Sequence, residues 1–398
     1  MSLPFTTVPV SCYNSLIPAL SITNPTQDLE TNDFIKIFGT MSALQKVDLR
    51  FAGQLKDEVL DHVMQQDTPI VDLRLDATNL VSNAKWIDFF SRCGNRLKSL
   101  KLSSLDYALD DNACLLLAKH CPNLRRLKLR KCFKLGDAAL KSLSRLNHLE
   151  HLSLQFQSDD PISPETLAQL ITAVGPRLRT LSLEDFKDAD DEVLAAIRSS
   201  CTKLVKFRFT NNDQCTNEGY KQMFLDSASQ PLSFVDLSDT RDVNYEVPDG
   251  PEEPVGLAST GFEALMEHSG TTLEVLNIHS CRHINHGSFS NVFDGDKQYP
   301  MLKDIDVSFI PAVDTTTIAA IIRCCPQLKK VSAFACFNVP GIEVPKGLAL
   351  IGVPDVSTSQ LMDMFLIRQI LTPFRPKRAL SRMEVLPWTC KFRDKPVL

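Results

Sequence analysis

Leucine and other apolar residues recur along this chain with the spacing L-x-x-L-x-L, in which a single residue separates the last two apolar positions. In the unit that starts at Leu124, Leu127 and Leu129 stand on either side of Lys128. Successive side chains of a strand point to opposite faces, so the two leucines share one face and Lys128 lies on the other. Each unit therefore predicts a short strand with one apolar and one polar face.

The unit repeats along most of the chain, and its first residue stands at positions 17, 44, 70, 97, 124, 149, 178, 204, 232, 273, 302 and 328. All but one of the spacings are 25–29 residues, which is the range of leucine-rich repeats. The exception, 41 residues, contains the acidic stretch YEVPDGPEEPVG. We interpret residues 244–258 as a loop inserted between two repeats, where extra residues cost little stability.

The segments between the predicted strands carry helical patterns such as DDNACLLLAKHCPN and DDEVLAAIRSSCTK. Asp110 and Asp190 are predicted N-caps, and Pro122 and Pro326 end helices shortly before the next strand. One strand–helix unit cannot bury its apolar face alone, whereas stacked units can. The sequence thus predicts an α/β leucine-rich-repeat solenoid, a curved horseshoe with parallel strands on the concave face and helices outside.

Three regions follow from this pattern and from the charge. We predict an N-terminal cap with a weak first repeat over 1–30, the solenoid over 31–355, and a basic, poorly ordered tail over 356–398. Residues 368–398 carry eight basic and two acidic side chains, which leaves residues 1–367 with a charge of −11 out of the total of −5. An acidic body with a basic tail repels phosphate over most of its surface.

The cysteines and the absence of apolar runs bear on the compartment. No apolar stretch reaches 18 residues and the first residues lack a secretory pattern, so we expect no membrane segment and a reducing cytosol or nucleus. Twelve cysteines in such a compartment argue against disulfides. Cys132, Cys281 and Cys336 each lie eight residues after a lead position, where a small thiol packs beneath a turn. They are predicted to be core residues.

No segment carries a recognisable catalytic motif such as a phosphate loop, a nucleophile elbow or paired CxxC. The cluster His279, Cys281, His283 and His286 has ligand types that suit zinc, but His279 falls on the polar strand face and Cys281 on the apolar side. We therefore expect no catalytic residue, no metal site, no cofactor and no enzymatic activity.

The polar face of the strands is the candidate binding surface. Two interpretations of its cations stay open: they grip an acidic peptide or a phosphate backbone, or they only solvate the strand face. The segment around 124 and positions 206–208 are basic, whereas positions 236 and 304–306 are acidic. The candidate residues, called here the concave basic stripe, are Lys46, Arg50, Arg74, Lys101, Arg126, Lys128, Arg130, Lys206 and Arg208.

Several stretches resemble a known family. VDLRFAGQLKDEVLDHVM (47–64), LRLDATNLVSNAKWIDFF (73–90), HCPNLRRLKLRKCFKLGDAALKSLSRLNHLEHLSLQF (120–156) and FACFNVPGIEVPKGLALIGVP (334–354) are similar to the cysteine-containing leucine-rich-repeat protein of fungal global-genome nucleotide-excision repair, the seventh of the Rad series. The resemblance spans roughly residues 30–355. Parts of it, such as LDATNLVS, lie partly outside the leucine positions that any such repeat shares.

The resemblance implies a nuclear, non-catalytic scaffold that partners a Snf2-type ATPase carrying a RING finger and acts on damaged chromatin indirectly. It also implies an elongin-C/cullin ubiquitin-ligase assembly. The family's adaptor-binding spacing is matched loosely by Ile197, Cys201 and Val205, which we interpret as a coincidence of repeat positions. The alternative function is the substrate-recognition subunit of an F-box-type ligase, which would use a Skp-type adaptor.

Overall fold

The structure, a computed structural model, describes residues 18–23, 29–52, 55–77, 80–155, 162–225, 229–240, 255–336, 338–339 and 344–353. The chain divides into two units, Met1–Pro354 and Asp355–Leu398, and every described residue belongs to the first. The predicted tail, most of the acidic insertion and most of the N-terminal cap thus lie outside the described residues, and these boundaries stay predictions.

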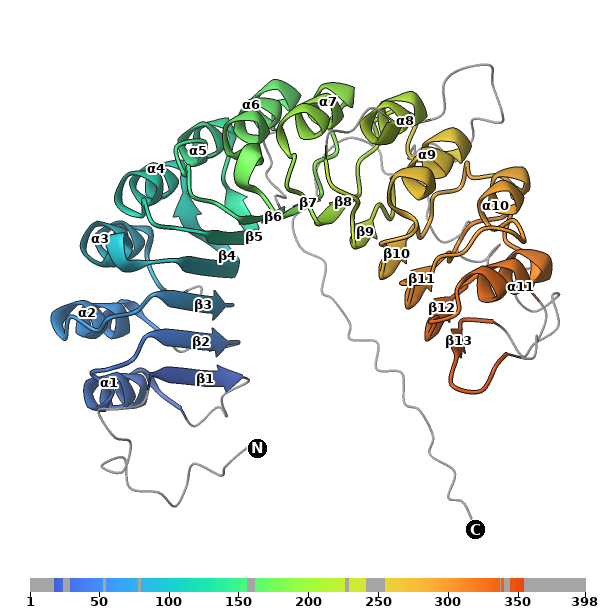
Figure 1. Cartoon of the computed structure of the whole chain (residues 1–398). Helices are drawn as coiled ribbons and strands as arrows, with labels where there is room; N and C mark the ends of the chain where they lie inside the picture. The colour runs from blue at the N-terminus through green and yellow to red at the C-terminus, as the bar shows by residue number, and fades with distance from the viewer. Residues whose placement is uncertain are drawn as a thin grey trace, which may run out of the picture. The chain divides into compact units, whose positions relative to one another are not determined.

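The described residues of the first unit form one parallel sheet in which each strand pairs with the next strand along the chain (Figure 1). The sheet runs one strand beyond the last predicted repeat. The repeat search missed this strand because glycine takes the lead position. The register pairs Val331 with Leu350, which makes Gly347 the equivalent of the lead residue Leu328. The strands are β1 (Ala19–Thr23), β2 (Lys46–Arg50), β3 (Asp72–Asp76), β4 (Ser99–Asp110), β5 (Arg126–Lys134), β6 (His151–Gln155), β7 (Thr180–Glu184), β8 (Lys206–Thr210), β9 (Phe234–Asp236), β10 (Val275–Asn277), β11 (Asp304–Asp306), β12 (Lys330–Ser332) and β13 (Ala349–Ile351).

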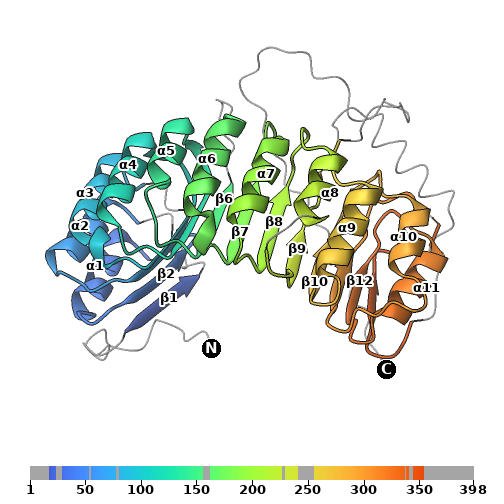
Figure 2. The ribbon, with the colours of Figure 1, turned by 45° about the horizontal axis from the view of Figure 1, so that its top comes forward.

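The helices cover one face of this sheet and lie side by side in chain order (Figure 2). Two of them, α3 and α6, continue into a short 3-10 turn. This arrangement confirms the predicted alternation of strand and helix. The helices are α1 (Thr31–Thr40), α2 (Asp57–Gln65), α3 (Asn83–Cys93), α4 (Asp111–His120), α5 (Asp137–Leu143), α6 (Pro164–Val174), α7 (Asp191–Ser200), α8 (Asn217–Leu225), α9 (Ser259–Ser269), α10 (His286–Val292) and α11 (Thr315–Cys324).

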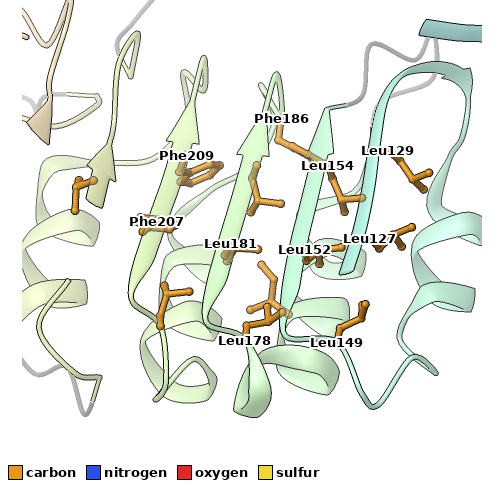
Figure 3. Close-up of a cluster of buried hydrophobic side chains, with 14 of the residues drawn as sticks. Leu127, Leu129, Leu149, Leu152, Leu154, Leu178, Leu181, Phe186, Phe207 and Phe209 are labelled. Atoms are coloured by element: carbon orange, nitrogen blue, oxygen red, sulfur yellow. The ribbon is translucent and has the colours of Figure 1, made fainter. Parts of the chain in front are cut away.

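The core lies between sheet and helices and is built from the apolar positions of the repeat. We call the face of the sheet that the helices leave uncovered the inner face. Figure 3 shows Leu127 and Leu129 of β5 in one layer with Leu152 and Leu154 of β6, all pointing away from the inner face. Leu127 is 2% exposed and the other three are fully buried. Because each layer packs on the next, the core is continuous along the described repeats.

In ten of the described repeats, those of β2 to β12 except β6, a non-glycine residue near the end of the paired strand adopts the left-handed conformation. At the position seven residues after the lead, φ is positive in non-glycine residues such as Lys131 (φ 51°), Asp185 (φ 67°) and Ser280 (φ 63°). The predicted turn cysteines follow directly and are buried; the Cys281 thiol, for example, donates to the Leu237 carbonyl at 3.2 Å. Their assignment to the core is confirmed.

Aspartates at the helix starts cap their own helices and join several repeats to the next one. Asp110 and Asp190 cap their helices as predicted, accepting from the backbone of Ala113 and Glu192. A second set of contacts, between the helix starts of neighbouring repeats, does not follow from the sequence pattern. The Asp137 carboxylate at the start of α5 accepts from the backbone N–H (3.0 Å) and hydroxyl (2.8 Å) of Ser163, the N-cap of α6. The same contact joins Asp57 to Ser82 and Asp191 to Thr216.

The Asp137 link predicts a pH-dependent contribution to stability. Burial acts to raise the pKa of Asp137, but the hydrogen bonds from Ser163 and Thr166 outweigh it and lower that pKa. A lowered folded-state pKa stabilises the fold above the unfolded value of about 4, and this stabilisation is lost as pH falls through the folded pKa. Asp137→Asn should therefore cost about 1 kcal/mol at neutral pH.

Chemical denaturation of the wild type and of Asp137→Asn between pH 7 and pH 3 measures this effect. The difference between their free energies of unfolding should narrow below pH 4. The control is Asp188→Asn, which removes an exposed carboxylate and should change stability by less than about 0.5 kcal/mol. A difference between wild type and Asp137→Asn that stayed constant down to pH 3 would contradict the role given to the carboxylate.

Candidate functional site

The inner face of the sheet carries three rows of side chains, because the parallel register places equivalent residues of neighbouring strands side by side. From β2 to β8, the first row is Lys46, Asp72, Ser99, Arg126, His151, Thr180 and Lys206. The middle row is Asp48, Arg74, Lys101, Lys128, Ser153, Ser182 and Arg208. The third row is Arg50, Asp76, Ser103, Arg130, Gln155, Glu184 and Thr210.

All nine residues of the concave basic stripe lie on this face, and the structure divides them into two groups. Those in ion pairs with carboxylates are Arg50, Arg74, Arg130 and Arg208. Within the described residues, those without a carboxylate in ion-pair contact are Lys46, Lys101, Arg126, Lys128 and Lys206. Only the second group has its charge available to a partner, and its role in binding stays a prediction.

Glu184 is the centre of the larger ion-pair network. Its carboxylate pairs with Arg130 of β5, across the intervening strand β6, and lies 3.5 Å from the Arg208 guanidinium of β8. Arg208 also approaches Asp236 of β9 at 2.9 Å, and Arg130 donates to the Gln155 amide oxygen at 2.7 Å. The network joins strands β5 to β9, and it neutralises two arginines that the sequence offered as binding residues.

A smaller network lies at β2 and β3. Asp48 accepts two hydrogen bonds from Arg50, at 2.9 and 2.7 Å, and lies 3.7 Å from Arg74. The hydrogen bond from Arg50 lowers the pKa of Asp48, against the opposing effect of burial, and Arg74 and Lys101 add to the lowering. Asp48 therefore stays charged at neutral pH and compensates its arginine neighbours.

The free cations are concentrated on two adjacent strands. Lys101 of β4 pairs in register with Lys128 of β5, and Arg126 lies in the first row of β5 beside Ser99. Burial lowers the pKa of the half-buried Lys128, and the neighbouring charge of Arg130 lowers it further. We call Lys101, Arg126 and Lys128 the β4–β5 cation cluster. Its chemistry is that of an anion-binding surface.

Sequence reasoning treated every cation of the stripe alike and missed the part that Glu184 plays. The signal was present in principle, since aligning the repeats by lead residue places Arg130, Gln155 and Glu184 in one row. The same alignment places Arg208 beside Asp236. Positions 206–208, which are basic in the sequence, thus contribute one free cation, Lys206.

The cysteines and histidines are dispersed, as the strand alternation indicated. Cys281 is buried, and burial raises the pKa of its thiol to about 12. His279 lies on the inner face, 4.9 Å from the Phe309 ring, and the ring of His286 lies 3.7 Å from Asp314. Across the described ranges, no group of three or more His, Cys, Asp or Glu side chains is placed to hold a metal ion.

Two of the three residues of the loose adaptor-binding spacing fall in the core, and the third, Val205, is partly buried. Ile197 is 1% exposed and Cys201 is fully buried, so these side chains pack inside the repeat rather than face a partner. This burial agrees with the interpretation of that spacing as a coincidence. Among the described helices, none has the length and apolar character needed to cross a membrane.

The stacked repeats and the polar inner face define a leucine-rich-repeat solenoid protein. The chain is similar to DNA repair protein rhp7 of Schizosaccharomyces pombe, with 26% identity over 299 residues that cover 72% of this chain and 48% of that protein. The resemblance noted in the sequence is confirmed. The chain spans about half the length of this curated relative. No family model matches the chain.

A solved structure gives the same fold. A chain in the crystal structure of the Rad7 and Elc1 complex in yeast superposes with a TM-score of 0.69 at 19% identity, covering 83% of this chain and 80% of that chain. At this identity the likeness shows the fold alone. It confirms the predicted α/β leucine-rich-repeat solenoid.

Proposed function

We propose that this chain is a non-catalytic scaffold of a DNA-repair complex that acts in global-genome nucleotide-excision repair in the nucleus. The observation that carries the proposal is the similarity to DNA repair protein rhp7 over 299 residues. The inner face supports a binding role, because its free cations suit docking of a charged partner. The buried cysteines fit a role outside catalysis, since burial keeps a thiol such as Cys281 protonated and weakly nucleophilic.

The proposed partners are the adaptor of a cullin-type ubiquitin ligase and a Snf2-type ATPase. The similar structure contains Elc1 together with Rad7, which supports an elongin-C-type adaptor for this chain. A Snf2-type ATPase carrying a RING finger is the second proposed partner, and damaged chromatin is reached through it. The concave basic stripe is the proposed docking surface for one of these proteins.

Affinity capture of the full chain from its own organism, followed by quantitative mass spectrometry, tests this proposal. We expect an elongin-C-type adaptor and a Snf2/RING ATPase to be enriched over a capture with an unrelated solenoid protein. Deletion of the gene should also increase sensitivity to ultraviolet light. Enrichment of a Skp-type adaptor with neither proposed partner would favour the F-box alternative and overturn the proposal.

A further inference from the structure

The β4–β5 cation cluster brings like charges together with no carboxylate in ion-pair contact among the described residues, and Asp48 and Glu184 offset the charges of Lys101 and Lys128 only from a greater distance. Lys101 and Lys128 are direct neighbours in the parallel register, and like charges in such positions destabilise a sheet. Elsewhere on the inner face the arginines are compensated, as Arg130 and Arg208 are by Glu184. An anionic ligand between the two lysines would remove the repulsion, so the cluster has the electrostatic character of an unfilled binding site.

A buried hydroxyl beside the cluster supports the same conclusion. Ser99 is 5% exposed, and its side-chain oxygen has no hydrogen-bond partner among the described atoms. It stands two residues before Lys101 on the same face of β4 and is paired in register with Arg126. An unmade hydrogen bond at a buried polar group costs free energy. Rotation of the Ser99 side chain toward Lys101 and Arg126 would let its hydroxyl donate a hydrogen bond to an oxygen of a bound ligand.

The surroundings of the cluster limit the size of the anion. On one side stand Asp72 and Asp76 of β3 and Asp48 of β2, and on the other stands Glu184 of β7. Between them, strands β4 to β6 span about 10 Å at the usual strand spacing of about 4.8 Å. Duplex DNA carries a negative charge every 1.7 Å or so along its axis, and would bring phosphates against these carboxylates.

A short acidic peptide fits these limits better. In an extended chain, alternate side chains lie on one side about 6.6–6.8 Å apart, so two or three carboxylates cover the area of the cluster. We propose that Lys101, Arg126 and Lys128, with the Ser99 hydroxyl, bind a run of two to three acidic residues in an extended segment of a partner protein. This inference stands on the geometry of the sheet and does not require the proposed repair function.

Fluorescence anisotropy with the full chain tests the inference. The probes are a labelled decapeptide of alternating glutamate and serine, the same peptide with glutamine for glutamate, and a labelled 20-base-pair duplex. We expect the glutamate peptide to bind in about 0.1 M salt and the glutamine peptide not to bind. Lys101→Glu with Lys128→Glu should weaken binding of the glutamate peptide at least tenfold.

The matched control is Lys119→Glu with Lys203→Glu, which makes the same charge change at two exposed lysines outside the concave basic stripe. The affinity of this control variant for the glutamate peptide should stay within about twofold of the wild-type affinity. Equal losses in both double variants would mean a general charge effect, and tighter binding of the duplex would identify a nucleic-acid surface. Either result, or no binding of the glutamate peptide, overturns the inference.

A second variant separates binding from folding. Lys101→Gln with Lys128→Gln removes both charges without adding new ones, and it should leave the unfolding midpoint unchanged or raise it, because the repulsion is relieved. The glutamine variant should nevertheless fail to bind the glutamate peptide. A folded glutamine variant that bound this peptide as tightly as wild type would contradict the proposed site.

Discussion

Replacing Leu127 with alanine is expected to lower the free energy of unfolding by about 2–5 kcal/mol, the largest effect predicted for this protein. Leu127 is 2% exposed and packs in the layer formed by Leu129, Leu152 and Leu154 (Figure 3). Truncation removes its transfer free energy and leaves a cavity that the rigid sheet closes only in part.

The control for this experiment is Leu115→Ala, the same substitution on the exposed side of α4, where Leu115 is 39% exposed. It should change stability by about 0.5 kcal/mol or less. Because repeats interact with their neighbours only, hydrogen exchange should accelerate most around β4–β6 and least at β11. Equal destabilisation by the two substitutions would contradict the packing described here.

Replacing Glu184 with glutamine is expected to cost about 1–3 kcal/mol, because it leaves Arg130 without a carboxylate and Arg208 with only Asp236. The side chain of Glu184 is 11% exposed, whereas those of the two arginines are 30% and 37% exposed. Solvent therefore screens part of the freed charge, which keeps the cost below that of a fully buried ion pair.

Denaturation of Glu150→Gln provides the comparison. Glu150 pairs with Arg125 at 3.1 Å, but that arginine is 62% exposed, so the substitution should cost less than about 0.5 kcal/mol. Reducing the salt concentration should increase the cost of Glu184→Gln, since the attraction between Glu184 and its two arginines, which the substitution removes, is then screened less. A Glu184→Gln protein as stable as Glu150→Gln would show that the network contributes nothing to the fold.

The division between paired arginines and free lysines has a consequence for function. A guanidinium forms several directed hydrogen bonds and suits a fixed position between carboxylates, as Arg208 has between Glu184 and Asp236. A lysine such as Lys128 has one mobile charge on a flexible stem. The inner face therefore combines a rigid network over β5–β9 with a cluster on β4 and β5 that is open to a ligand.

Much of the fold could be predicted because the repeat encodes it locally. The spacing of Leu124, Leu127 and Leu129 identifies the strand and its buried face, and Asp110 with Pro122 delimits a helix. The repeat pattern missed β13, where Gly347 replaces the lead leucine and the spacing from the previous repeat is shorter. It also missed the contact of Asp137 with Ser163, because neither residue belongs to the leucine pattern.

The period of the repeat, the buried face of each strand and the burial of the turn cysteines could all be predicted, since each depends on residues a few positions apart in the chain. Which cations of the inner face lack a carboxylate partner depends instead on contacts between repeats. Arg130 and Glu184 are 54 residues apart in the chain, and they meet because the parallel register stacks their repeats. Apolar periodicity sets the direction in which a side chain points, whereas its partner depends on which strands lie beside it.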